Sequence, residues 1–165
     1  MHLHTKIILT LMEGKMNKKL TIRAAIATLA STLLFAPAVA IAQTAWEAQA
    51  RTYLENEAAT YLPDYSLSQR LMIGSLNTGA TQSRTVRLQG GVEYALLGAC
   101  DDDCSDLDLR LFTNRGGTLI DVDDEPDDFP LVTVTPSRTA NYQIQAEMYS
   151  CSSEPCYYAI GVYRR

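Results

Sequence analysis

The chain beyond residue 42 contains no histidine and no lysine. Both histidines and all four lysines of the 165 residues precede that position. Histidine is the commonest general base and a frequent zinc ligand in enzymes, and lysine is the residue that forms Schiff bases. Because both are missing, the larger part of the chain is not expected to be an enzyme, and a binding role is favoured.

A second long apolar run is also missing. The one that is present, Ala24 to Ala36, follows a positive stretch and precedes Ala40-Ile41-Ala42, an order typical of a secretory signal peptide with its cleavage site. The run is shorter than the roughly 20 apolar residues that a membrane-spanning helix needs. We therefore expect export, cleavage before Gln43 and no membrane insertion afterwards, which places the protein in the periplasm or outside the cell.

The sequence divides at the expected cleavage position and again at Pro63. Residues 1–42 are interpreted as an upstream extension plus the signal peptide, with Met16 as the better translational start. Residues 43–63 are expected to form a helix and residues 64–165 a β-sandwich. After cleavage nine arginines oppose eighteen acidic residues, a net charge of −9. Such a surface repels phosphates and anionic lipids, so nucleic acid is not an expected partner.

The four cysteines all follow the leader, and none of them forms a Cys-x-x-Cys pair. That spacing argues against thiol redox chemistry, and an even cysteine number in an exported chain indicates two disulfides. Three connectivities are open, of which we favour the local pairs Cys100 with Cys104 and Cys151 with Cys156 over cross-links between the two loops. A four-thiolate zinc site is the less favoured alternative.

The segment from Thr44 to about Leu62 has helical spacing of its apolar residues and no glycine or proline. Thr44 and Glu47 have the spacing of a capping box, and Pro63 ends the helix. The aromatic residues of this segment, among them Trp46 and Tyr61, are expected to pack against the sandwich. The sequence therefore predicts one amphipathic helix before the strands.

After Pro63 the pattern changes to an alternation of apolar and polar residues, with turn signals about every ten residues, which predicts an antiparallel β-sandwich. Gly90-Gly91 has the form of a two-residue hairpin turn. Neither this pair nor Gly116-Gly117 has the strand-to-helix context of a phosphate-binding loop. The candidate strands are Arg70–Leu76, Val86–Leu88, Val92–Leu96, Leu107–Leu111, Thr118–Val122, Val132–Val134, Tyr142–Met148 and Tyr157–Tyr163.

One stretch of sequence resembles the bacterial pre-peptidase C-terminal domain. An acidic turn precedes Asp106-Leu107-Asp108-Leu109-Arg110-Leu111-Phe112, and a glycine-containing turn and a second acidic loop follow. Farther on, Thr139-Ala140-Asn141-Tyr142-Gln143-Ile144 is similar to the turn and Y-x-I strand of that family, so the resemblance spans roughly residues 83–163. It implies a jelly-roll-like β-sandwich with an accessory binding role. This chain differs in having an amino-terminal helix and two additional disulfides, and no protease domain accompanies it.

Eleven acidic residues lie between Asp101 and Asp128. Carboxylates at this density repel one another unless solvent screens them or a hard cation such as calcium, which takes six to eight oxygen ligands, neutralises them. The spacing does not fit an EF-hand, because Pro126 stands where its glycine belongs. A solvated acidic surface is the alternative. The tentative calcium ligands are Asp103, Asp106, Asp123 and Asp124.

Tyrosines near the carboxyl terminus are the other candidate binding residues. Tyr149 and Tyr157, with Tyr158 and Tyr163, could form a stacking surface for a sugar or a peptide, although tyrosine also simply suits strands. Asp106 and Asp108 share a strand face and could in principle cleave a glycoside, but alternating aspartates are more often the polar side of a strand.

Together these features predict an exported, non-catalytic binding or accessory module. Its acidic loops would bind calcium or a cationic patch on a protein or polysaccharide partner that the sequence does not identify. The alternatives are a purely structural envelope protein and a peptidase-associated or inhibitor-like factor.

Overall fold

The computed structural model describes residues 38–114 and 117–165. The predicted Met16 start and the apolar run of the signal peptide lie outside the described residues, whereas the predicted cleavage position after Ala42 lies within the first described helix. In order, the elements are α2 (Ala38–Tyr61), β1 (Ser66–Leu67), β2 (Met72–Leu76), β3 (Thr81–Leu88), β4 (Tyr94–Cys100), β5 (Cys104–Thr113), β6 (Leu119–Asp123), β7 (Leu131–Val134), β8 (Ala140–Cys151) and β9 (Cys156–Arg164).

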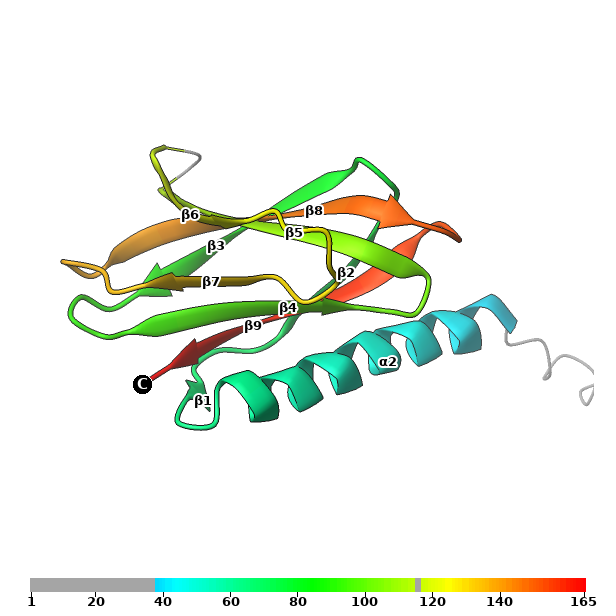
Figure 1. Ribbon diagram of the computed structural model, residues 1–165, viewed down its shortest axis with the longest axis horizontal. Helices are drawn as coiled ribbons and strands as arrows, with labels where there is room; N and C mark the ends of the chain where they lie inside the picture. The colour runs from blue at the N-terminus through cyan, green and yellow to red at the C-terminus, as the bar shows by residue number, and fades with distance from the viewer. Residues whose placement is uncertain (1–37, 115–116) are drawn as a thin grey trace, which may run out of the picture. The chain divides into compact units, whose positions relative to one another are not determined.

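The strands form two antiparallel sheets packed face to face (Figure 1). The first sheet has the order β1-β9-β4-β7, and β2 pairs with the part of β9 that β1 leaves free. The second sheet has the order β3-β8-β5-β6. Apart from β5 and β6, successive strands from β2 onward lie in different sheets, which is the winding of a jelly roll. The predicted mainly-β sandwich after one helix is therefore confirmed.

Alternation along the strands produces the core between the sheets. On β8, Tyr142, Ile144, Ala146 and Met148 are buried while the residues between them are partly exposed, as the period of two requires. Leu107, Leu109 and Leu111 of β5 are fully buried against them. On both strands, the apolar members of the alternating pattern are the ones that face the core.

The helix α2 covers the opposite face of the first sheet (Figure 1). Ala50, Leu54, Ala58 and Leu62 repeat every four residues and pack on apolar residues of β4 and β9. Those central strands are consequently buried on both faces. Two expectations about the helix are wrong: it begins at Ala38, so Thr44 lies inside it rather than at its cap, and Tyr61 is 64% exposed because it points away from the packed face.

The Gly90-Gly91 turn does not form the predicted hairpin. β3 and β4 belong to different sheets, so this turn carries the chain across the sandwich. Gly91 has a φ of 77°, a left-handed conformation that glycine adopts without strain. Its amide donates to the carbonyl of Pro136 at 2.8 Å, which joins this turn to the loop between β7 and β8.

Candidate functional site

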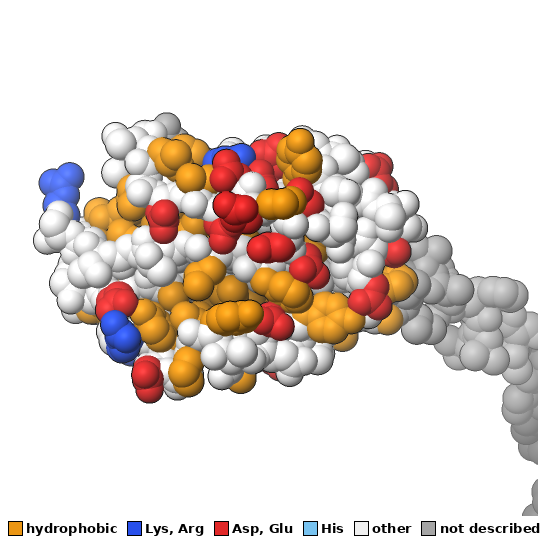
Figure 2. Space-filling model, viewed as in Figure 1, with side chains coloured by type: hydrophobic (Ala, Val, Ile, Leu, Met, Phe, Trp, Pro, Cys, Tyr) orange, Lys and Arg blue, Asp and Glu red, His pale blue; other side chains and the backbone are white. Residues whose placement is uncertain are grey.

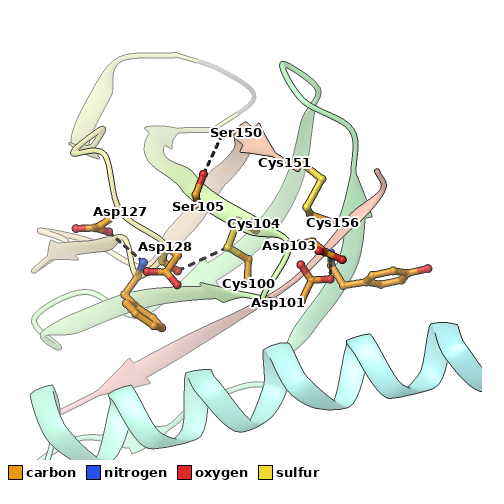
Figure 3. The surroundings of a disulfide bond; sticks show 12 residues. Cys100, Asp101, Asp103, Cys104, Ser105, Asp127, Asp128, Ser150, Cys151 and Cys156 are labelled. Atoms are coloured by element: carbon orange, nitrogen blue, oxygen red, sulfur yellow. Dashed lines mark hydrogen bonds between the residues drawn. A yellow bond between two sulfur atoms is a disulfide. The ribbon is translucent and has the colours of Figure 1, made fainter. Parts of the chain in front are cut away.

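Two disulfides close one end of the sandwich, and they are the local pairs that the sequence analysis favoured (Figure 3). Cys100–Cys104 links the end of β4 to the start of β5, and Cys151–Cys156 links the end of β8 to the start of β9. Each therefore fastens a crossing between the two sheets and not the end of a hairpin. Cys104 and Cys151 are register partners in the second sheet, so the two bridges lie side by side.

The acidic turn within the first disulfide loop holds the helix in place. The carboxylate of Asp102 accepts hydrogen bonds from the Tyr53 hydroxyl at 2.5 Å and from the Gln49 side-chain amide at 2.7 Å. The backbone amide of Asp102 donates to the side-chain oxygen of Gln49 at 3.1 Å. The hydrogen bond to Asp102 is the main cause that raises the pKa of Tyr53. Asp102 thus has a structural role.

Asp101 is one of the two acidic residues that are buried in the described part of the chain, with 2% of its surface exposed. Its Oδ2 atom accepts a hydrogen bond from the Tyr157 amide at 2.8 Å, but Oδ1 is buried and has no partner among the described residues. Burial raises the pKa of this carboxyl group, and the negative charge of Asp103 adds to the effect. In Figure 3, Asp101 and Asp103 lie on one side of the Cys100–Cys104 bridge.

The acidic residues divide into two groups around that bridge. Asp127 and Asp128 lie on the other side of it in Figure 3, and the Asp128 carbonyl oxygen is 3.9 Å from the Cys100 Sγ atom. The second acidic loop lies against β5, because the Leu107 amide donates to the Asp127 carbonyl at 2.9 Å. The bridge nevertheless separates Asp103 from the acids of the second loop.

A cleft of about 290 Å³ lies on the outer face of the second sheet, where the loop after β6 approaches β5 and β8. We call it the acidic cleft. Its lining is mostly charged, and one exposed aromatic side chain, Tyr149, stands at its edge. The lining residues are Asp106, Asp108, Arg110, Asp124, Pro126 and Tyr149.

Arg110 neutralises part of the charge beside this cleft. Its guanidinium group donates to Asp108 at 2.9 Å and to Glu147 at 2.6 Å. Asp108 and Glu147 are register partners on neighbouring strands, so the arginine separates two carboxylates that would repel each other. Asp108 lies on the polar side of β5 with Asp106 and Arg110, as expected, but it is not exposed. Only 4% of its surface is accessible, and burial raises its pKa although Arg110 opposes the shift.

Asp106 has no such counter-ion. Its Oδ1 atom is buried and accepts no hydrogen bond from the residues the structure describes. Burial is the first cause that raises the pKa of Asp106, followed by repulsion from Asp108 and Asp127. A positively charged group entering the cleft would relieve this repulsion.

The four tentative calcium ligands are not gathered around one point. Asp106 and Asp124 line the acidic cleft, whereas Asp103 is not part of its lining. Asp123 uses its carboxylate for backbone amides, with Oδ2 2.8 Å from the Leu131 nitrogen and Oδ1 3.3 Å from that of Glu125. Within the described ranges, no group of three or more His, Cys, Asp or Glu side chains is arranged to hold a metal ion.

Asp121 and Asp123 join the free edges of the two sheets. The Oδ2 atom of Asp121 accepts from the Thr133 amide at 2.7 Å, so both acids of β6 bind amides of β7. Inward-pointing carboxylates of this kind occupy the donors of an edge strand and prevent it from pairing with another chain. This part of the acidic sequence therefore stabilises the sandwich.

The tyrosines do not form a single stacking surface. Tyr149 lies on β8 and is 63% exposed, whereas Tyr157 lies on β9 in the other sheet and is half-buried. Tyr158 and Tyr163 are 2% and 7% exposed and belong to the two cores. Of the candidate aromatic residues, Tyr149 alone borders the acidic cleft. The sequence analysis missed Arg110 and Glu147, although Arg110 continues the alternation of Asp106 and Asp108.

Comparisons with known proteins add little to this geometry. No family model and no curated protein matches the chain. Among solved structures, it is similar to Aeromonas hydrophila PliG, a periplasmic lysozyme inhibitor of g-type lysozyme, with a TM-score of 0.43 and 14% identity over 58% of this chain and 85% of that one. A likeness at this level supports no inference about function. The resemblance to the pre-peptidase C-terminal domain stays a prediction.

The described part of the chain contains no helix with the length and apolar character that crossing a membrane requires.

Proposed function

We propose that this protein is an exported, non-catalytic binding module whose acidic cleft receives a positively charged side chain from the surface of a protein partner. The observation that carries the proposal is Asp106, which lines the cleft with two further carboxylates and has no counter-ion among the described residues. A lysine or arginine of a partner would supply the counter-ion that Asp106 lacks.

Shape and charge support the same ligand class. Asp106, Asp108 and Asp124 contribute three carboxylates to the cleft lining, and Arg110 contributes one guanidinium, so the lining is formally negative. Tyr149 at the edge is exposed and can stack on an arginine or cover the stem of a lysine. Two disulfides close to the cleft keep the surrounding turns in place and are typical of an oxidising compartment, which supports export.

The test uses N-acetyl-arginine amide and N-acetyl-lysine amide as probes, titrated into the ¹⁵N-labelled protein. We expect saturable chemical-shift changes at Asp106, Asp124 and Tyr149. Asp106→Asn should weaken probe binding at least about fivefold, since it removes a charge-assisted hydrogen bond. Glu55→Gln, which removes the same charge from an exposed position of α2, is the matched control and should leave binding unchanged. If Asp106→Asn and Glu55→Gln behave alike, the acidic cleft is not the site.

Calcium is the second candidate occupant, because Asp106 and Asp124, two of its tentative ligands, line the same cleft. A cation held there would be expected to stabilise the folded state by about 2.7 kcal/mol at one hundred times its dissociation constant. Melting curves recorded in calcium chloride and in a chelator test this directly. Curves that superimpose would reject calcium and leave the side-chain proposal intact.

The narrower roles suggested by the sequence remain proposals of the same kind. A peptidase-associated or inhibitor-like factor would present its cleft to an enzyme, whereas a purely structural envelope protein would not bind either probe. Failure of both probes and of calcium would therefore favour the structural role.

A further inference from the structure

A second and larger cleft, of about 470 Å³, lies at the other end of the sandwich from the disulfides. Its walls come from the segment after β1, from β3 and the loop that follows it, from the loop before β8 and from the end of β9. Tyr94 and Arg164 are register partners on β4 and β9, so one end of the first sheet forms its floor. We call it the basic cleft.

Two arginines from different sheets enter the lining of this cleft. Arg87 belongs to β3 of the second sheet, and Arg164 to β9 of the first. Neither forms a salt bridge with any residue in the described ranges, and both are exposed. Arg110 and Arg165, in contrast, are each paired with a carboxylate. Among the described residues, neither Arg87 nor Arg164 is therefore neutralised by a salt bridge.

In the described part of the chain, acidic residues near this cleft form no salt bridge with either arginine, although Asp64 lines a neighbouring cleft beside Arg164. The described residues that line the cleft include no aspartate or glutamate. The adjacent Glu93 is already engaged, because it accepts hydrogen bonds from Tyr65 and from Arg165, both at 2.6 Å. In Figure 2, acidic side chains gather over the centre and right of the visible face, whereas the basic ones are few and lie mostly toward the left.

Two hydroxyl groups add hydrogen-bond donors to the positive charge. The Tyr94 hydroxyl accepts a hydrogen bond from the Gln89 amide at 3.1 Å, and Thr139 Oγ1 accepts one from the Gly90 amide at 3.0 Å. A hydroxyl oxygen that accepts in this way keeps its own proton to donate, and neither hydroxyl donates to another group in the described structure. Tyr94 is 4% exposed, so its hydroxyl is fixed in position.

The wall that carries these donors is rigid. Gly90 packs so tightly that a Cβ atom there would lie 2.6 Å from the Cα atom of Arg138, and the amide of Gly91 donates to the carbonyl of Pro136 at 2.8 Å. The two loops are thus fastened to each other before any ligand arrives. A site of this kind loses little conformational entropy on binding.

We propose that the basic cleft binds a small oxyanion, a carboxylate or a phosphate carried on a polar body of sugar size. Arg87 and Arg164 would each present a planar pair of N–H donors, the geometry that matches carboxylate and phosphate oxygens. Tyr94 and Thr139 would donate to the remaining oxygens. The negative net charge of the chain repels extended anionic surfaces, which favours small ligands at this cleft.

The test is isothermal titration of the full folded protein with glucuronate, glucose 6-phosphate and inorganic phosphate, with glucose as the neutral control. We expect saturable binding of at least one anion, with a dissociation constant of about 1 mM or lower, and none of glucose. Comparing glucuronate with glucose 6-phosphate tells carboxylate from phosphate recognition, and inorganic phosphate shows whether the sugar body is needed.

Arg87→Gln and Arg164→Gln should each weaken binding at least about tenfold, the loss expected for one charge-assisted contact. Arg51→Gln removes the same charge from an exposed position of α2 and should change binding less than about twofold if contacts rather than net charge are responsible. Circular dichroism of each variant checks that the fold is intact. Absence of saturable binding by all three anions, or an equal loss in Arg51→Gln, would overturn the proposal.

Discussion

The acidic cleft and the basic cleft differ in whether their charged side chains are paired with one another and shielded from water. In the acidic cleft Arg110 pairs with Asp108 and Glu147, and the carboxyl groups of Asp106 and Asp108 are partly withdrawn from water. In the basic cleft Arg87 and Arg164 are exposed and unpaired among the described residues. Substitutions in the acidic cleft should therefore change both stability and binding, whereas substitutions in the basic cleft should change binding alone.

The largest effect is expected from the disulfides at the acidic end. Replacing all four cysteines by serine should lower the free energy of unfolding by about 4 kcal/mol, since each loop of five or six residues contributes about 2 kcal/mol in the chain-entropy model. Urea denaturation measures the loss. At urea concentrations below the unfolding transition, the basic cleft at the opposite end should still bind its anion. Loss of binding at both clefts in the folded variant would show that the clefts are not independent.

Arg110→Met should have the next largest effect. The substitution leaves Asp108, whose side chain is 5% exposed, and Glu147 without their counter-ion. We expect a loss of about 2 kcal/mol, between the values for buried and for surface ion pairs, because Arg110 and Glu147 are partly exposed. Chemical denaturation at pH 7 provides the measurement. Arg87→Met is the matched control, and an equal loss there would remove the contrast between the clefts.

Asp106→Asn should stabilise the protein at pH 7 by about 1 kcal/mol, because it removes the charge of a partly buried carboxylate whose Oδ1 atom lacks a donor among the described residues. The pKa of Asp106 is raised in the folded state, so the folded protein binds its proton more readily than the unfolded chain does. The resulting stability is present below the unfolded pKa of about 3.9 and is lost as the pH rises through the folded value.

This pH dependence gives the substitution its test. When the pH is lowered from 7 toward 4, the contribution of Asp106 should make the free energy of unfolding more favourable to folding in the wild type than in Asp106→Asn, relative to the values at pH 7. Thermal denaturation of both proteins across that range measures the difference. Parallel curves would show that the cleft does not perturb Asp106.

The smallest effect on stability is expected at the basic cleft. Arg87→Gln and Arg164→Gln remove exposed side chains without partners among the described residues, so each should change the free energy of unfolding by less than about 0.5 kcal/mol. Urea denaturation beside the binding assay separates the two properties. A loss above about 1 kcal/mol would show that these arginines have a structural role that the geometry does not reveal.

Local pattern was enough to predict much of this fold. The period of two on β8 and the spacing of four on α2 identified the buried faces, and the short cysteine separations favoured the disulfides that form. Features of the fold that depend on long-range contacts were not predicted. β9 is apolar on both faces because α2, about a hundred residues earlier, covers its second side, and the Gly90-Gly91 turn crosses between sheets that only the complete topology defines.

The binding sites were less accessible to sequence reasoning. The density of acids indicated a charged region, but it could not tell Asp102 and Asp121, which accept hydrogen bonds from the protein, from Asp106, which has an oxygen without a donor. The basic cleft left no local signal at all. Arg87 and Arg164 line one cleft only because β3 and β9 finish at the same end of the sandwich.

The most direct test of two oppositely charged sites is one NMR experiment with two ligands. Titrating the labelled protein with N-acetyl-arginine amide should shift Asp106, Asp124 and Tyr149, and titrating it with glucuronate or glucose 6-phosphate should shift Arg87, Tyr94 and Thr139. We expect two saturable sets of shifted residues that do not overlap. A single shared set, or shifts that grow without saturation for every ligand, would contradict it.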